Sequence, residues 1–150
     1  KNNSIKRFVN NFNKLPDYLK KCIVIENDDK VFNVSDTLKI SDMINVPIVL
    51  DYHHYKCNKS DIDIKKIFNT WNIKPKLHFS SPKSKKNFRS HSDYINSDDF
   101  IEFIEFIKKY NTDVDIMLET KMKDEALFRL VRELKYKTNY NFIDDTSFEI

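Results

Sequence analysis

Side chains that could bind a metal ion recur where short apolar runs of this sequence end. Carboxylate oxygens and imidazole nitrogens are ligands for hard or borderline divalent ions such as Mn2+ or Zn2+. The two cysteines form no CxxC pair, so little in the chain indicates a softer metal. Taken alone, each carboxylate could equally be a helix cap or a solvated loop residue. The polar residues at the run ends are Glu26, Asn27, Asp28 and Asp29, then Asp51, Tyr52, His53 and His54, then Lys76 and His78, and finally Glu119.

The elements that would position these side chains alternate between helices and strands. Helices are expected at 4–14, 35–44, from the capping-box pattern at 60–63 onward, at 98–110 and at 124–137, and strands at 22–25, 47–51, 75–80 and 114–118. Strict alternation of helices with apolar strands implies right-handed βαβ units and a parallel sheet. Such a sheet places ligand sites at the carboxyl ends of its strands, so the candidate ligands should converge there.

The spacing of the strands limits the architecture. A repeat of ~25–40 residues suits a (β/α)8 barrel or a doubly wound sheet. Four strands cannot close an eight-stranded barrel of ~250 residues. We therefore expect an α/β fold that forms half of a TIM barrel, and the start at Lys1 without Met suggests a piece of a longer protein.

Composition excludes several classes of protein. The chain has 150 residues and no glycine, which rules out phosphate-binding loops of the GxxxxGKS and GxGxxG types. No apolar run approaches the ~20 residues that span a bilayer, and the first 15 residues lack a signal-peptide core. We therefore expect an intracellular protein, cytoplasmic or nuclear. The pI of 8.7 is compatible with a nucleic-acid partner without requiring one.

Five ordered motifs together resemble the carboxyl-terminal half of the UV damage endonuclease family. They are IEND at 25–28, LDYHH at 50–54, PKLHFS at 75–80, RSHSDYI at 89–95 and DIMLETKMK at 115–123. The resemblance implies that residues 1–150 are the last four βα units of a TIM barrel. The missing amino-terminal half, or another chain, would then cover the exposed sheet edges.

The resemblance also implies a reaction and its cofactor. The family nicks UV-damaged double-stranded DNA immediately 5′ to the lesion, leaving a 3′-hydroxyl and a 5′-phosphate. It uses a cluster of about two or three Mn2+ ions, a number in keeping with metal-assisted phosphodiester hydrolysis. The metal ligands implied by the resemblance are Glu26, Asp51, His54, His78, His91 and Glu119.

Two positions carry further roles by resemblance. Lys76 and Glu119 match catalytic positions, and Lys76 matches a lysine that can be carboxylated in the family. An unmodified Lys76 could instead be a counter-charge or a phosphate contact. His53 matches no ligand position, so we expect it either to pack in the interior or to support a ligand without binding the metal.

Basic residues near the candidate ligands could hold a DNA backbone. Counterion release favours lysine and arginine beside phosphates, although such runs are commonly only solvated loops. The candidates are Lys83, Lys85, Lys86, Arg89, Lys121 and Lys123. Two other functions remain open, namely a metal-dependent sugar isomerase of the xylose isomerase type and a remnant that binds DNA without chemistry.

Overall fold

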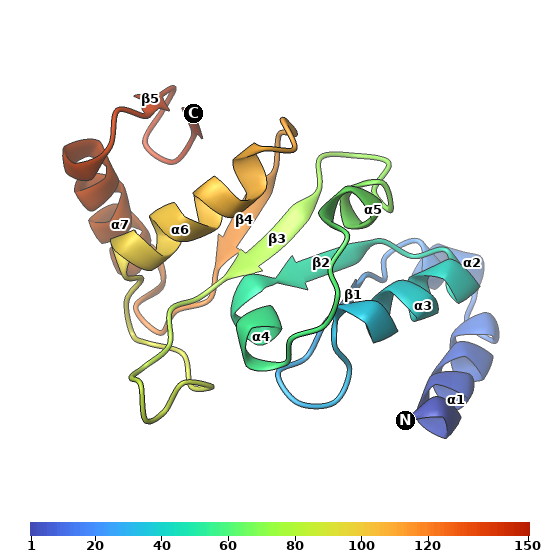
Figure 1. Ribbon diagram of the computed structural model, residues 1–150. Helices are drawn as coiled ribbons and strands as arrows, with labels where there is room; N and C mark the ends of the chain where they lie inside the picture. Colours follow the sequence, from blue (N-terminus) through green and yellow to red (C-terminus); the bar gives the residue numbers. More distant parts are fainter. The chain divides into compact units, whose positions relative to one another are not determined.

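The computed structural model describes all 150 residues, in which helices and strands alternate along the chain (Figure 1). Four strands form one sheet in the order β1 (Ile25–Glu26), β2 (Ile48–Asp51), β3 (Lys76–Phe79) and β4 (Asp115–Leu118). β1 pairs with β2 and β2 with β3 in parallel. The predicted α/β fold with a parallel sheet is confirmed.

The chain divides into two compact units. The first unit contains Lys1–His78 and Asp113–Ile116, and the second contains Phe79–Thr112 and Met117–Ile150. The helices of the first unit are α1 (Asn2–Asn13), α2 (Asp17–Lys20), α3 (Val34–Ile44), α4 (Tyr52–Cys57) and α5 (Ile64–Phe68). The second unit contains α6 (Ser97–Lys108), α7 (Lys123–Lys137) and an antiparallel hairpin of β5 (Asn141–Phe142) and β6 (Phe148–Glu149).

The first unit is built around β2. α3 packs against β1 and β2, α5 packs against β2, and α1 packs on α3 (Figure 1). Every residue of β2 is buried, as expected of a strand that is covered on both faces. The indole nitrogen of Trp71 donates to the carbonyl of Ile48 at 2.8 Å, which ties the segment after α5 to the start of this strand.

Local sequence explains where α3 begins and ends. The side chain of Asn33 accepts from the amide of Asp36, whose carboxylate accepts from the amide of Asn33, so the two residues form a capping box. At the other end Asn45 adopts a left-handed conformation with φ of 53°, a region that asparagine tolerates better than most residues. The helix therefore ends one residue before the turn into β2.

A cluster of aromatic rings lies in the second unit. The ring of Phe79 stacks on Phe103 with centroids 5.0 Å apart and meets the edge of Phe100 at 5.2 Å. Phe148 of the hairpin stacks on Tyr140 at 5.0 Å, which attaches the hairpin beside α6 through its contact with Phe100. Such ring pairs add to the stabilisation that burial alone provides.

Two predicted starts were wrong by three residues or more, whereas the other bounds agree to within two residues. The first strand begins at Ile25 rather than Cys22, because Cys22 lies in a turn and the first sheet bond runs from the Ile25 amide to the carbonyl of Pro47. The helix expected from residue 60 begins at Ile64 with Asp63 as its N-cap. The Ser60 hydroxyl instead accepts from the amide of Ser35, so it caps a different helix.

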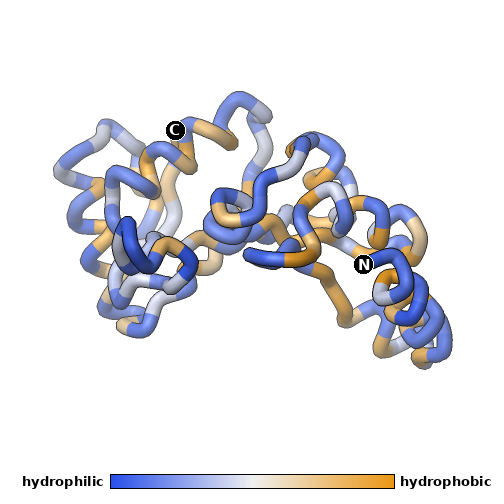
Figure 2. Tube along the Cα trace, turned by 60° about the horizontal axis from the view of Figure 1, so that its bottom comes forward, coloured by the Kyte–Doolittle hydropathy of each residue, from blue (hydrophilic) through white to orange (hydrophobic).

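Apolar stretches of the trace are short and alternate with hydrophilic ones (Figure 2). This is the pattern of amphipathic elements that bury one face. None of the helices has the length and apolar character that crossing a membrane requires.

Candidate metal centre

The parallel register of the first unit brings three predicted ligands to the same end of the sheet. Glu26 is the last residue of β1 and Asp51 is the last residue of β2. His78 in β3 is the direct register partner of Asp51. Because parallel strands end at one edge, residues that are far apart in sequence become neighbours there.

The carboxylate oxygens and imidazole nitrogens of this group lie close enough together to bind one ion. Glu26 Oε1 lies 3.3 Å from His78 Nδ1 and 3.4 Å from His54 Nδ1. Glu26, Asp51 and His78 each offer one ligand atom, and these atoms lie within 4.8 Å of one another. Two carboxylates and an imidazole are a donor set that fits Mn2+ or Zn2+. The group could therefore hold a divalent ion.

α4 presents His54 to this group because Asp51 caps the helix. The Asp51 side chain is fully buried, and its Oδ1 accepts from the amide of His54 at 2.7 Å. The second carboxylate oxygen, Oδ2, lies 3.7 Å from His54 Nδ1. One aspartate therefore serves both as N-cap and as candidate ligand, and it fixes the helix that carries the imidazole.

Opposite charges shift the pKa values of the group. Burial raises the pKa of Glu26, but hydrogen bonds and charge from His54 and His78 outweigh burial and lower it to about 2. The hydrogen bond to Glu26 raises the pKa of His54 to about 9 against the opposing effect of burial, with Asp51 contributing further. Glu26 and His54 therefore form an ion pair at neutral pH.

A residue that sequence analysis did not identify braces these ligands. The Asn27 side chain donates to the carbonyl of Asp51 and accepts from its amide, both at 3.0 Å. The carbonyl of Asn27 contacts His54 Nδ1 at 3.0 Å. Its position directly after the candidate ligand Glu26 was the only signal in the sequence.

The second unit holds the remaining two predicted ligands together. His91 Nδ1 lies 3.5 Å from Glu119 Oε2. His91 is held by an antiparallel bridge to Pro82, and the amide of Glu119 donates to the carbonyl of Phe79 at 2.9 Å. Within this unit the structure thus pairs the imidazole and the carboxylate that the motifs singled out.

Lys76 lies beside a carboxylate of the same unit. Its ammonium forms an ion pair with Asp115, and the ammonium of Lys74 lies 3.8 Å from the same side chain. The hydrogen bond from Lys76 is the main cause that lowers the pKa of Asp115. Lys76 therefore provides a counter-charge for Asp115.

The predicted basic residues are all exposed. The segment between β3 and α6 contains Lys83, Lys85, Lys86 and Arg89. Lys121 lies between β4 and α7, and Lys123 is the first residue of α7. Lys121 Nζ is 3.6 Å from Asp93. These positions leave the side chains accessible to a polyanion.

His53 and Cys57 face each other on α4. His53 is 1% exposed, as predicted for a packed imidazole, and its Nε2 lies 3.8 Å from the Cys57 sulfur. Neither cysteine is in a disulfide, and Cys22 is exposed.

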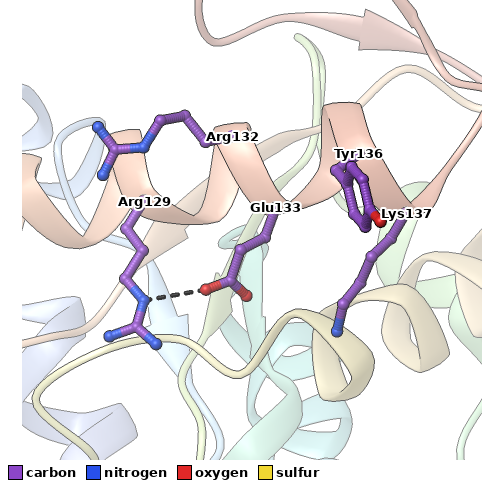
Figure 3. A pocket seen from close by; sticks show the side chains of 5 residues that line it. All are labelled: Arg129, Arg132, Glu133, Tyr136 and Lys137. Atoms are coloured by element: carbon purple, nitrogen blue, oxygen red, sulfur yellow. Dashed lines mark hydrogen bonds and ion pairs between the residues drawn. The ribbon is translucent and has the colours of Figure 1, made fainter.

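A pocket of about 380 Å³ lies on the surface of α7 (Figure 3). Five residues of that one helix line it, namely Arg129, Arg132, Glu133, Tyr136 and Lys137. The Arg129 Nε donates to Glu133 at 2.9 Å, an i,i+4 pair typical of a solvated helix face. None of the predicted site residues lines this pocket.

Comparison with known proteins identifies the family. The UV DNA damage endonuclease of Bacillus cereus (strain G9842) is 45% identical over 141 residues, covering 89% of this chain and 44% of the relative. That of Bacillus anthracis (strain A0248) is 43% identical with the same coverage. The chain thus spans about half the length of the curated relatives it matches.

A solved structure agrees with these relatives. The crystal structure of SacUVDE matches with a TM-score of 0.77 at 34% identity, covering 89% of this chain and 46% of that one. The family model described as UV-endonuclease UvdE matches residues 1–149. The matching family model is that of UV endonucleases and not that of sugar isomerases. The chain belongs to the UV-endonuclease UvdE family.

Proposed function

We propose that this chain supplies half of a metal-dependent endonuclease that nicks UV-damaged double-stranded DNA immediately 5′ to the lesion. The products would be a 3′-hydroxyl and a 5′-phosphate. One observation carries the proposal: Glu26, Asp51 and His78 offer ligand atoms within 4.8 Å of one another in a chain of this family.

The proposed ligands are Glu26, Asp51, His54, His78, His91 and Glu119, with Mn2+ as the cofactor. Bound divalent ions would supply an activated water and neutralise the charge on the phosphoryl oxygens. The last residue of β3 supports a role for Glu119, because the carbonyl of Phe79, directly after His78, accepts from the Glu119 amide. Carboxylates that are already ionised at low pH, as Glu26 is, need lose no proton when they bind a cation.

The exposed basic residues would contact the DNA backbone. Lys83, Lys85 and Lys86 follow β3, and Arg89 lies close to His91 in sequence, so the cations flank candidate ligands along the chain. Phosphate contacts of this kind position a duplex without reading its sequence. Lys121 and Lys123, which follow Glu119, are proposed for the same role.

Lys76 is proposed as an auxiliary catalytic group in one of two forms. As an ammonium it neutralises Asp115 and could turn to a phosphate. A carboxylated Lys76 would be an anion, so it would have to leave Asp115 before acting near the metal.

The half-length match gives the architecture we propose for the whole protein. Residues 1–150 would form the last four βα units of a TIM barrel, and an amino-terminal half or another chain would cover the sheet edges. The protein would act wherever the DNA of the cell lies, in the cytoplasm or the nucleus.

Nicking of UV-irradiated supercoiled plasmid tests the proposal. The chain is assayed alone and together with the amino-terminal half of the Bacillus cereus relative, with Mn2+ or with EDTA. We expect Mn2+-dependent nicking of irradiated plasmid only, and a loss of at least ~100-fold in the Glu119→Gln variant. Glu105→Gln, which removes an exposed carboxylate paired with Lys108, is the matched control. Equal nicking by both variants would remove Glu119 from the site, and no nicking under any condition would favour a remnant without chemistry.

A further inference from the structure

Asn27 is among the most deeply buried polar residues of the first unit. It is 1% exposed and lies between Glu26 and the loop that leads to α3. Burial of an amide without partners is costly, but both polar atoms of this side chain are bonded. Its two bonds go to the main chain of a single residue, Asp51, at 3.0 Å each.

These two bonds form a reciprocal bridge between the ends of two strands. β1 and β2 pair in the sheet only through Ile25 and Glu26. Beyond this pairing, the Asn27 side chain bonds to the main chain of Asp51, the last residue of β2. The bridge therefore fixes the main chain of one candidate ligand, Asp51, relative to another, Glu26.

The main chain of Asn27 acts on a third candidate ligand. Its carbonyl oxygen lies 3.0 Å from His54 Nδ1. A carbonyl can only accept a hydrogen bond, so this contact requires a proton on Nδ1 and leaves Nε2 as the nitrogen that can bind a metal. Residues that hold metal ligands in place without binding the ion typically change metal affinity 10- to 100-fold when they are removed. Substitution of the Asn27 side chain removes its bridge to Asp51 and keeps this carbonyl.

We propose that Asn27 is a positioning residue of the metal centre, setting the main chain of Asp51 and the ring of His54 without binding the ion itself. This inference rests on the proposed function, because it assumes that these residues bind a divalent metal. It assigns the residue a role that a merely structural buried asparagine would not have.

Ser41 provides the matched control for a structural role. It is 5% exposed, and its hydroxyl donates to the carbonyl of Val46 at 2.7 Å within the same unit. Ser41→Ala thus also removes a buried bond from a side chain to the main chain. It lies on α3 and makes no contact with the candidate ligands through this bond.

Mn2+ titration followed by electron paramagnetic resonance tests the inference. The purified wild-type protein and its Asn27→Ala and Ser41→Ala variants are titrated well below their melting temperatures. We expect the dissociation constant of Mn2+ to rise about 10- to 100-fold in Asn27→Ala and to change less than about twofold in Ser41→Ala. If Asn27→Ala does not fold, Asn27→Ser replaces it, because its shorter hydroxyl leaves room for a water and cannot span both groups of Asp51.

Each outcome decides one question. Mn2+ affinity in the Asn27 variant equal to that of wild type overturns the inference and leaves the metal site standing. An equal loss of affinity in both variants overturns it as well, since the effect would then follow stability alone. A wild-type protein that binds no Mn2+ overturns the proposed function, and the inference with it.

Discussion

The ion pair between Glu26 and His54 should make the stability of the metal-free protein depend on pH in both directions. The pKa of Glu26 is lowered from 4.5 to about 2, so its contribution is present above pH 4.5 and is lost as pH falls toward 2. The pKa of His54 is raised from 6.5 to about 9, so its contribution is present below pH 6.5 and is lost as pH rises through 9. Stability should therefore be greatest between about pH 4.5 and 6.5.

The magnitude follows from the same pair. The difference between 4.5 and about 2, at about 1.4 kcal/mol per pKa unit, corresponds to roughly 3 kcal/mol before solvent screening. Both shifts largely describe one interaction, so this free energy is counted once. The Glu26 side chain is 33% exposed, and solvent screening reduces the contribution to about 1–2 kcal/mol. For a chain of this size, that is a change in melting temperature of roughly 2–8 °C.

Thermal unfolding in EDTA from pH 3 to pH 9.5 measures the effect. The wild-type protein should lose about 1–2 kcal/mol between pH 6.5 and 9.5, whereas Glu26→Gln should lose much less over that range. The surface variant Glu105→Gln should retain the wild-type profile. A wild-type profile that is flat above pH 6.5, or a Glu26→Gln profile as steep as that of wild type, would refute the ion-pair account.

Three further outcomes are expected. Mn2+ at 100 times its dissociation constant should stabilise the protein by about 2.7 kcal/mol, measured as a rise in melting temperature that Asp51→Asn abolishes. Replacing Lys83, Lys85 and Lys86 by alanine should weaken binding to irradiated duplex DNA, measured by fluorescence anisotropy. The slope of log affinity against log salt concentration should become shallower by up to about 3. An unchanged slope would place these lysines away from the phosphates. Leu50→Ala, at a fully buried position of β2, should cost about 2–5 kcal/mol in urea unfolding, and a loss below 1 kcal/mol would contradict its place in the core.

The candidate site was predictable because of a general property of parallel sheets. Glu26, Asp51 and His78 lie far apart in the sequence, yet each occurs at or near the end of an apolar run. Once the alternation of helices and strands indicates a parallel sheet, their convergence follows from geometry. Helices with a strong apolar period, such as α3, α6 and α7, were predictable for a similar reason.

Features that depend on register or on very short elements were not predictable. α4 has only six residues and no apolar repeat, and it is defined by the cap that Asp51 provides. The run from Cys22 to Ile25 resembles a buried strand, but only Ile25 finds a partner in the sheet, and Val24 is 44% exposed. Asn27 braces the site through main-chain groups of Asp51, so its importance depends on how β1 and β2 align.

The location of bound Mn2+ tests the central claim most directly. A crystal of the protein grown with Mn2+ and measured at the manganese absorption edge gives an anomalous map that identifies the ion. The account predicts a peak at coordination distance, roughly 2.0–2.6 Å for common divalent ions, from side-chain atoms of Glu26, Asp51 and His78. A map with no peak beside these three residues, or with manganese bound only elsewhere, would contradict it.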